Sequence, residues 1–406
     1  MPGGFSVPDA ERHRLAYVGR NGQLHVLTIL PDGTTATRQF TWSIRASTGM
    51  LWGVEGAGSS ASWPCWSPDG TQIACFIQSF SETEDAETRV AVVEVDGVRE
   101  HRFAPLVDRM PIHCQWSPDG MRLAVLVQFE ELLELWIAEV GAEASPLRLV
   151  AEGSPLFFGW AEHGRRVVLH IGDNGSGDAR LEVRDVVGDD DDVVFRIPPS
   201  NFCVPFAVAV GAEERVLYVV QRGQHSQIAS ADLHGEDVLG LGVADGLVAL
   251  VPSESAARVA FAAAPDADGS PYTTVQCVSV DGSDNPGPFI DGPVVAFFWR
   301  PQHGQPIWVT HEGDQRHIQW HCGQPDGEAL SLGRCVPTRD TYFHLHFFEQ
   351  FVRSHPLTSH DGRWLVWASH DAAVDSTGPM VFLTDLNADN PRARPVCPGS
   401  YAVFAP

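Results

Sequence analysis

Two copies of one short box constrain this chain more than any other feature. Residues Trp66 to Gly70 and Trp116 to Gly120 both read Trp-Ser-Pro-Asp-Gly, and their tryptophans are 50 positions apart. Proline presets φ and glycine accepts a positive φ, so Ser-Pro-Asp-Gly predicts a turn. The runs IACFI and LAVLV that follow are apolar throughout, which is typical of strands packed on both faces. Each box therefore predicts an antiparallel hairpin.

Weaker copies of the hairpin recur along the chain, each with a polar residue opening the second strand. The opening positions are Arg14, Gln72, Arg122, Arg166, Arg215, Arg258, Gln305 and Arg363. A repeat of roughly fifty residues with about four strand candidates is typical of a β-propeller blade. We therefore expect an all-β fold, a single β-propeller domain over residues 1–406, with eight four-stranded blades favoured and seven as the alternative.

The end of the chain carries one more strand candidate. The last residues, YAVFAP from Tyr401, have the pattern of a first strand, and no second strand follows them. An unpaired strand edge invites aggregation. We expect this strand to join the blade begun by the N-terminus, so that exchange of N- and C-terminal strands closes the ring.

The two boxes resemble the TolB-like, WD-repeat-like propeller repeats that also occur in dipeptidyl-peptidase-type enzymes. In those peptidases an α/β-hydrolase domain carries the serine nucleophile on a G-x-S-x-G turn. This sequence has no such motif. The resemblance therefore implies the propeller without the peptidase activity.

The segment HLHFFEQFVRSHPLTSHDGRWLVWAS resembles the last blade of oligogalacturonate lyases. Those propellers hold a divalent metal through a Gln-x-x-His-x-His arrangement before a Ser-Pro-Asp-Gly turn. Gln350 and His355 match the outer positions of that arrangement, whereas the middle position is Arg353. The resemblance implies lyase chemistry with one ligand replaced.

Histidines gather in the same region and provide candidate ligands. His344 and His346 alternate, so they would share one face of a strand, and His355 follows shortly after. Three imidazoles with Gln350 or Glu349 could hold a divalent metal as a Lewis acid. The alternative is that these histidines have surface or hydrogen-bonding roles and that no cofactor is bound. Arg353 and Glu349 are the candidate binding residues, with Arg353 placed to neutralise a carboxylate.

Charge and hydropathy restrict the partners. The formal net charge is −25 and all 27 basic residues are arginine, so a nucleic acid partner is not expected. The start, MPGGFSVPDAERHR, lacks the basic and apolar regions of an export signal, and no apolar run approaches the length of a membrane span. The eight cysteines are scattered without a C-x-x-C pair. We expect a cytoplasmic protein with reduced thiols and no membrane partner.

Two functions remain open from sequence. The first is a non-catalytic interaction platform that binds a protein partner through its loops or central face. The alternative is a metal-dependent lyase or hydrolase acting on an acidic saccharide near His344, His346, Gln350 and His355. The sequence leaves open whether the protein is an enzyme, which oligomeric state it has, and which molecule it recognises.

Overall fold

The structure is a computed structural model. It describes residues 12–38, 58–80, 87–95, 100–141, 146–172, 179–187, 193–197, 204–223, 225–255, 257–264, 271–313, 316–324, 328–370 and 378–406. The chain divides into two compact units. Unit 1 comprises Met1–Val107, Cys335–Tyr342 and His355–Pro406, and unit 2 comprises Asp108–Arg334 and Phe343–Ser354. The expectation of a single domain over residues 1–406 stays a prediction.

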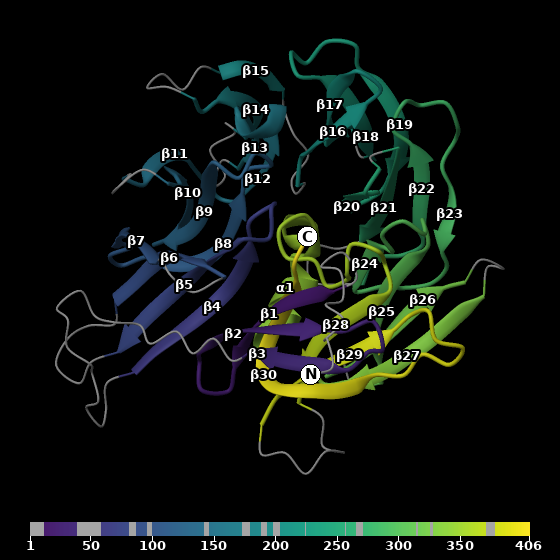
Figure 1. The fold of residues 1–406 in the computed structure, drawn as a ribbon. Helices are drawn as coiled ribbons and strands as arrows, with labels where there is room; N and C mark the ends of the chain where they lie inside the picture. Colours follow the sequence, from purple (N-terminus) through teal and green to yellow (C-terminus); the bar gives the residue numbers. More distant parts are fainter. Residues whose placement is uncertain are drawn as a thin grey trace. The chain divides into compact units, whose positions relative to one another are not determined.

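Unit 1 contains a four-stranded sheet and a six-stranded sheet. The four-stranded sheet consists of β4 (Gly58–Trp66), β5 (Gln72–Phe80), β6 (Glu87–Glu94) and β7 (Glu100–Pro105). The six-stranded sheet has the order β28 (Trp364–Ser369), β29 (Met380–Asp385), β30 (Arg394–Phe404), β1 (His13–Gly19), β2 (Leu24–Ile29) and β3 (Thr35–Arg38). The two ends of the chain therefore share one sheet (Figure 1).

Unit 2 consists of five sheets, each built from four strands consecutive in sequence (Figure 1). The first two comprise β8 (Met110–Trp116), β9 (Arg122–Phe129), β10 (Leu132–Glu139) and β11 (Arg148–Gly153), then β12 (Leu156–Ala161), β13 (Arg166–Ile171), β14 (Arg180–Asp185) and β15 (Val193–Ile197), with the 3₁₀ turn η2 (Glu162–Gly164) between β12 and β13. The third comprises β16 (Phe206–Val210), β17 (Glu213–Arg222), β18 (His225–Asp232) and β19 (Leu239–Ala244).

The fourth and fifth sheets of unit 2 repeat the same plan. They comprise β20 (Leu247–Pro252), β21 (Arg258–Ala264), β22 (Val275–Ser279) and β23 (Gly287–Ile290), then β24 (Ala296–Trp299), β25 (Pro306–Glu312), β26 (His317–Gly323) and β27 (Ala329–Cys335). Two short helices follow, α1 (Arg339–His346) and α2 (Phe348–Phe351). Four-stranded antiparallel sheets in up-and-down order are the blades of a β-propeller, which confirms the expected all-β fold.

The number of blades differs from the favoured expectation. The described strands form seven sheets, so there are seven blades and not eight. In the sequence, the hairpins that begin at Arg14 and Arg363 were counted as two separate blades. In the structure, strand β30 pairs with both ends of the chain and makes them one sheet. Its first half pairs with β29 (Val381 opposite Cys397), and its second half pairs with β1 (Leu15 opposite Phe404). The local repeat could not reveal this pairing, because it connects opposite ends of the sequence.

The two boxes form the predicted turns. Asp69 accepts hydrogen bonds from the Ser67 hydroxyl (2.6 Å) and the Thr71 N–H (3.0 Å). Gly70 has φ of 65°, a conformation that favours glycine. The second strands begin at Gln72, Arg122, Arg166 and Arg258, as the sequence predicts.

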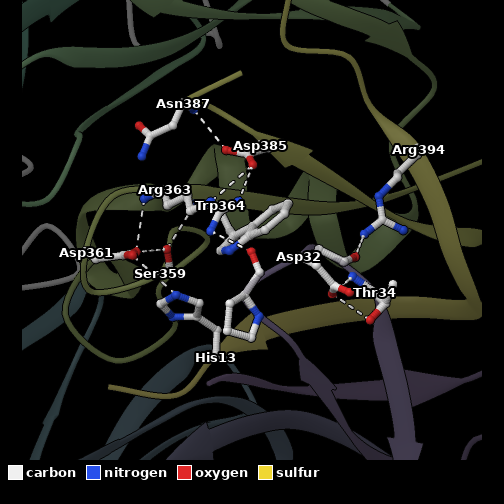
Figure 2. Close-up of polar contacts among 12 residues, drawn as sticks. His13, Asp32, Thr34, Ser359, Asp361, Arg363, Trp364, Asp385, Asn387 and Arg394 are labelled. Atoms are coloured by element: carbon white, nitrogen blue, oxygen red, sulfur yellow. Dashed lines mark hydrogen bonds and ion pairs between the residues drawn. The ribbon is translucent and has the colours of Figure 1, made fainter. Parts of the chain in front are cut away.

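Polar contacts hold the six-stranded sheet of unit 1 together where the two ends of the chain meet (Figure 2). The Arg363 guanidinium pairs with Asp385 (Nη2 to Oδ2, 2.8 Å) and donates to the Pro31 carbonyl (3.0 Å). Arg394 donates to the carbonyl of Gly33. The strands of this sheet also carry a buried apolar cluster that includes Phe404, in strand β30. The pairing of β30 with β1 is therefore supported by both packing and side-chain bonds.

Among the described residues, no helix has both the length and the apolar character needed to cross a membrane.

Candidate functional site

The predicted site residues lie on the segment that follows β27, which is helical and not extended. His344 and His346 belong to α1. The expectation that they share one face of a strand is wrong, because residues two apart point to different sides of a helix. The signal was present in the apolar positions Phe343, Phe347 and Phe351, which recur every four residues.

Residues 343–354, which we call the hub segment, contact the first strand of each of the five blades of unit 2. Phe348 packs on Phe297 of β24, with ring centroids 5.0 Å apart. On the β8 side, His113 Nε2 and Ser354 Oγ share a hydrogen bond of 2.7 Å, and His113 lies edge-on to Phe351. The remaining three strands are reached by Glu349, Gln350 and Arg353, the polar side chains that the sequence singled out.

The side-chain amide of Gln350 forms two hydrogen bonds with the backbone of one residue of β12. Its Oε1 accepts the Phe158 N–H (3.2 Å), and its Nε2 donates to the Phe158 carbonyl (3.0 Å). Both residues are buried. Since buried backbone groups need partners, the amide has a structural role that the sequence could not show. A divalent metal fits this residue poorly, because both ends of the amide are already held by the strand.

Glu349 reaches β20 with its carboxyl group. The Leu250 N–H donates to Glu349 Oε1 at 2.6 Å. Burial raises the pKa of Glu349 to about 8, although this hydrogen bond acts in the opposite direction. The carboxyl group is therefore mostly protonated at neutral pH.

Arg353 reaches β16 and keeps part of its side chain accessible to solvent. Its Nη1 donates to the Ala207 carbonyl (2.9 Å), and its guanidinium carbon lies 5.5 Å from the centroid of the Phe206 ring. Burial by the surrounding protein lowers the pKa of Arg353 to about 10, opposed by the charge of Glu214. Arg353 is therefore anchored on β16 through one nitrogen, while its side chain stays exposed.

The predicted histidine ligands have different surroundings. His344 is fully buried against Phe298 and Phe351, with centroids at 6.2 and 4.9 Å, whereas His346 is exposed. His355 belongs to unit 1.

His355 is buried among aromatic rings of unit 1. The centroids of Trp63 and Tyr401 each lie 6.3 Å from its ring. Burial lowers the pKa of His355 to about 3, with a backbone hydrogen bond involving Trp63 acting in the opposite direction. The imidazole is therefore neutral at physiological pH, the form that binds metals. The predicted metal set is divided between the two units and stays a prediction.

Comparisons with known proteins show the fold. No protein-family model matches the chain, and no curated protein matches its sequence. The β-propeller domain of the Trilobed protease from Pyrococcus furiosus is similar in structure at 12% identity, over 84% of this chain and 98% of that chain, with a TM-score of 0.50. This likeness agrees with the blade topology and shows a β-propeller.

Two further structures match less well. The oligogalacturonate lyase from Vibrio parahaemolyticus is 12% identical over 85% of each chain, with a TM-score of 0.49. TolB from Acinetobacter baumannii is 13% identical over 75% of this chain and 74% of that chain, with a TM-score of 0.39. The resemblance to TolB-like and lyase propellers is a likeness of fold, and the activity of this chain must be argued from its own residues.

Proposed function

We propose that this chain is a non-catalytic β-propeller interaction platform that binds a protein partner through its loops. The observation that carries the proposal is that polar side chains of the hub segment bind the backbone of the blades. Gln350, Glu349 and Arg353 bond to backbone groups of Phe158, Leu250 and Ala207. Polar side chains that could serve catalysis instead hold first strands of the blades, which suits a rigid scaffold.

The loops of unit 2 offer a surface for such a partner. Met121, Leu149 and Val187, which we call the Met121 edge, are exposed by 60%, 37% and 47%. Arg148, the first residue of β11, donates to the carbonyl of Val186 (3.0 Å), which joins this strand to the segment that follows β14 in the next blade. Exposed apolar side chains are a feature of interaction sites, and Leu149 and Val187 each follow directly on a residue of the Arg148–Val186 contact.

The charge of the chain indicates the chemistry of the partner. Glu139, which lies opposite Arg122 at the start of β9 and so close to Met121, is exposed by 64% at its side chain. The whole chain carries −25. We expect a partner surface with an apolar centre and a basic rim, because complementary charges favour encounter and orientation.

The test is cross-linking in the native cells followed by mass spectrometry. Met121→Glu should abolish the cross-link to one partner protein, whereas Val243→Glu, an equally exposed apolar position on another blade, should retain it. Circular dichroism checks that both variants are folded. The platform proposal fails at this edge if the two variants keep the same cross-linked partner, and it fails altogether if the wild type has none.

A second candidate is the metal-dependent lyase or hydrolase acting on an acidic saccharide. The observation in its favour is the pair formed by Arg353, whose side chain is exposed, and Glu349, four residues earlier in the sequence, whose carboxyl group has a pKa of about 8. Such a pair could bind a sugar carboxylate and transfer a proton. Elemental analysis of untagged protein tests it: a stoichiometric metal that is lost in His355→Ala favours the enzyme, and metal-free protein leaves the platform ahead.

Two finer expectations belong to the same proposal. We infer that the propeller ring is closed by exchange of terminal strands, supported by the pairing of Tyr401 with Val18 and of Phe404 with Leu15. We also propose a cytoplasmic location, which the eight scattered cysteines without a C-x-x-C pair support.

A further inference from the structure

The outermost strand of the third sheet of unit 2, β19, carries neither a charged residue nor a proline. Its sequence is Leu-Gly-Leu-Gly-Val-Ala. The last strand of each of the other four sheets of unit 2 contains an arginine or a proline, namely Arg148 in β11, Arg196 in β15, Pro288 in β23 and Arg334 in β27. Charges and prolines at a sheet edge prevent a further strand from pairing there. Among the described outer strands of unit 2, β19 is therefore the best suited to accept another strand.

The backbone of β19 is paired on one side. Its sheet has the order β16-β17-β18-β19, so β18 is the one strand that pairs with it within the described residues. In an antiparallel pair, the N–H and C=O groups of alternate residues point away from the neighbouring strand. The register with β18 shifts once, but β11, β15 and β23 have the same irregularity, so it does not set β19 apart. Backbone groups of β19 can thus bond a strand of another molecule.

Apolar side chains are exposed along the same edge. Val243, within β19, is exposed by 61%, and Val238, just before the strand, by 53%. Leu239 is half-buried. An added strand would cover these side chains with its own alternate residues. β19 therefore offers backbone hydrogen bonds together with apolar contacts, the combination by which a sheet edge binds an extended peptide.

The charge around β19 favours a basic partner. Glu236 and Asp237 precede the strand and Asp245 follows it, and all three are exposed. Two arginines lie nearby: Arg215 pairs with Asp237 (2.7 Å), and Arg222 lies in the hairpin between β17 and β18. The acidic residues outnumber these arginines, and the whole chain carries −25. Basic residues at the ends of an added strand would complement this field.

A second copy of the chain fits this edge less well. Antiparallel pairing of two β19 strands about a twofold axis would bring Asp237 of one copy close to Asp245 of the other. Their side chains are exposed by 67% and 79%, and His225 next to Asp245 is charged only when protonated. Like charges at opposite positions destabilise a strand pair. The charges at this edge therefore disfavour self-association.

We propose that β19 binds an extended segment of a partner protein as an additional antiparallel strand. The segment has apolar residues at alternate positions and basic residues at its ends. Affinity comes from the backbone pairing and selectivity from the two acidic ends of the edge. This inference goes beyond the Met121 edge, because it concerns a different blade and recognition through the backbone.

Fluorescence anisotropy with a labelled peptide, Arg-Val-Thr-Val-Thr-Val-Arg, blocked at both ends, tests the proposal. Wild-type protein should bind one peptide with a micromolar Kd. Exchange of the two arginines for glutamates should weaken binding at least about tenfold at low salt. Exchange of the three valines for prolines keeps the charge but removes strand pairing, and should abolish binding.

A matched pair of variants locates the binding edge. Val243→Arg places on β19 a charge of the kind that the other outer strands carry, and should weaken peptide binding at least about tenfold. Val187→Arg adds the same charge at another exposed apolar position of unit 2 and should leave binding unchanged. Hydrogen exchange needs no variant: the peptide should slow exchange of the amides of Leu239–Ala244 and leave that of β23 unaltered.

Three results would overturn the proposal. They are the absence of peptide binding, equal binding of the proline peptide or the glutamate peptide, and equal affinity of Val243→Arg and wild type. Analytical ultracentrifugation checks the other occupant, since a wild-type dimer that Val243→Arg abolishes would assign the edge to a second copy instead. Loss of the Met121-edge partner with peptide binding intact would refute that docking edge alone.

Discussion

Replacing Glu349 by glutamine should stabilise the protein at pH values above about 4.5, and it should have no effect on stability at lower pH. The carboxyl group titrates at 4.5 when free and at about 8 in the folded chain, because burial disfavours its charge. The unfolded state therefore releases a proton that the folded state keeps. The free energy of unfolding is therefore highest below pH 4.5 and falls as the pH rises towards 8, by at most about 1.4 kcal/mol per pH unit.

The magnitude follows from these two values. Full desolvation would disfavour the folded state by about 5 kcal/mol above pH 8. Since Glu349 is only partly buried by accessible area, we expect about half of that, roughly 2–3 kcal/mol. Glutamine keeps an oxygen to accept the Leu250 N–H and has no charge to bury.

Urea unfolding at several pH values between 4 and 9 measures the effect. The free energies of unfolding of Glu349→Gln and wild type should coincide near pH 4 and separate progressively up to pH 8. Glu213→Gln, at an exposed position of the same unit, is the control for the loss of one charge and should follow the wild type. A difference that does not vary with pH, or a variant less stable than wild type at pH 8, would refute the reasoning.

Three further predictions concern stability, measured by denaturant unfolding. Gln350→Ala should lower the free energy of unfolding by about 2–4 kcal/mol, because it leaves the Phe158 N–H and carbonyl without partners; Gln128→Ala, at a surface position, should cost less than about 0.5 kcal/mol. Phe404→Ala should cost about 3–5 kcal/mol by opening a cavity between β30 and β1, and hydrogen exchange at β1 should accelerate. Burial acts to raise the pKa of Asp361, but hydrogen bonds from Ser359 and the Arg363 N–H hold it below its usual value. The ionised carboxylate should therefore add to the free energy of unfolding above about pH 4, and wild type should lose this stabilisation at lower pH. Asp361→Asn, which has no carboxylate to protonate, should not show this loss.

The sequence by itself determined the repeating elements. The Trp-Ser-Pro-Asp-Gly boxes specify their turns through contacts no more than five residues apart, such as Asp69 with Thr71 and Ser117 with Arg122. Short apolar runs bounded by such turns are typical of strands packed on both faces. For this reason the all-β fold, the four-stranded blades and the starts of half of the expected second strands could be predicted.

Only the tertiary structure decided how the ends combine and what the candidate site residues do. The pairing of β30 with β1 reduced the count from eight blades to seven. Gln350 and Phe158 are 192 residues apart, and Arg353 and Ala207 are 146 apart. Contacts at such separations leave no periodic trace in the sequence, because they depend on which backbone groups the folded blades present to the hub segment.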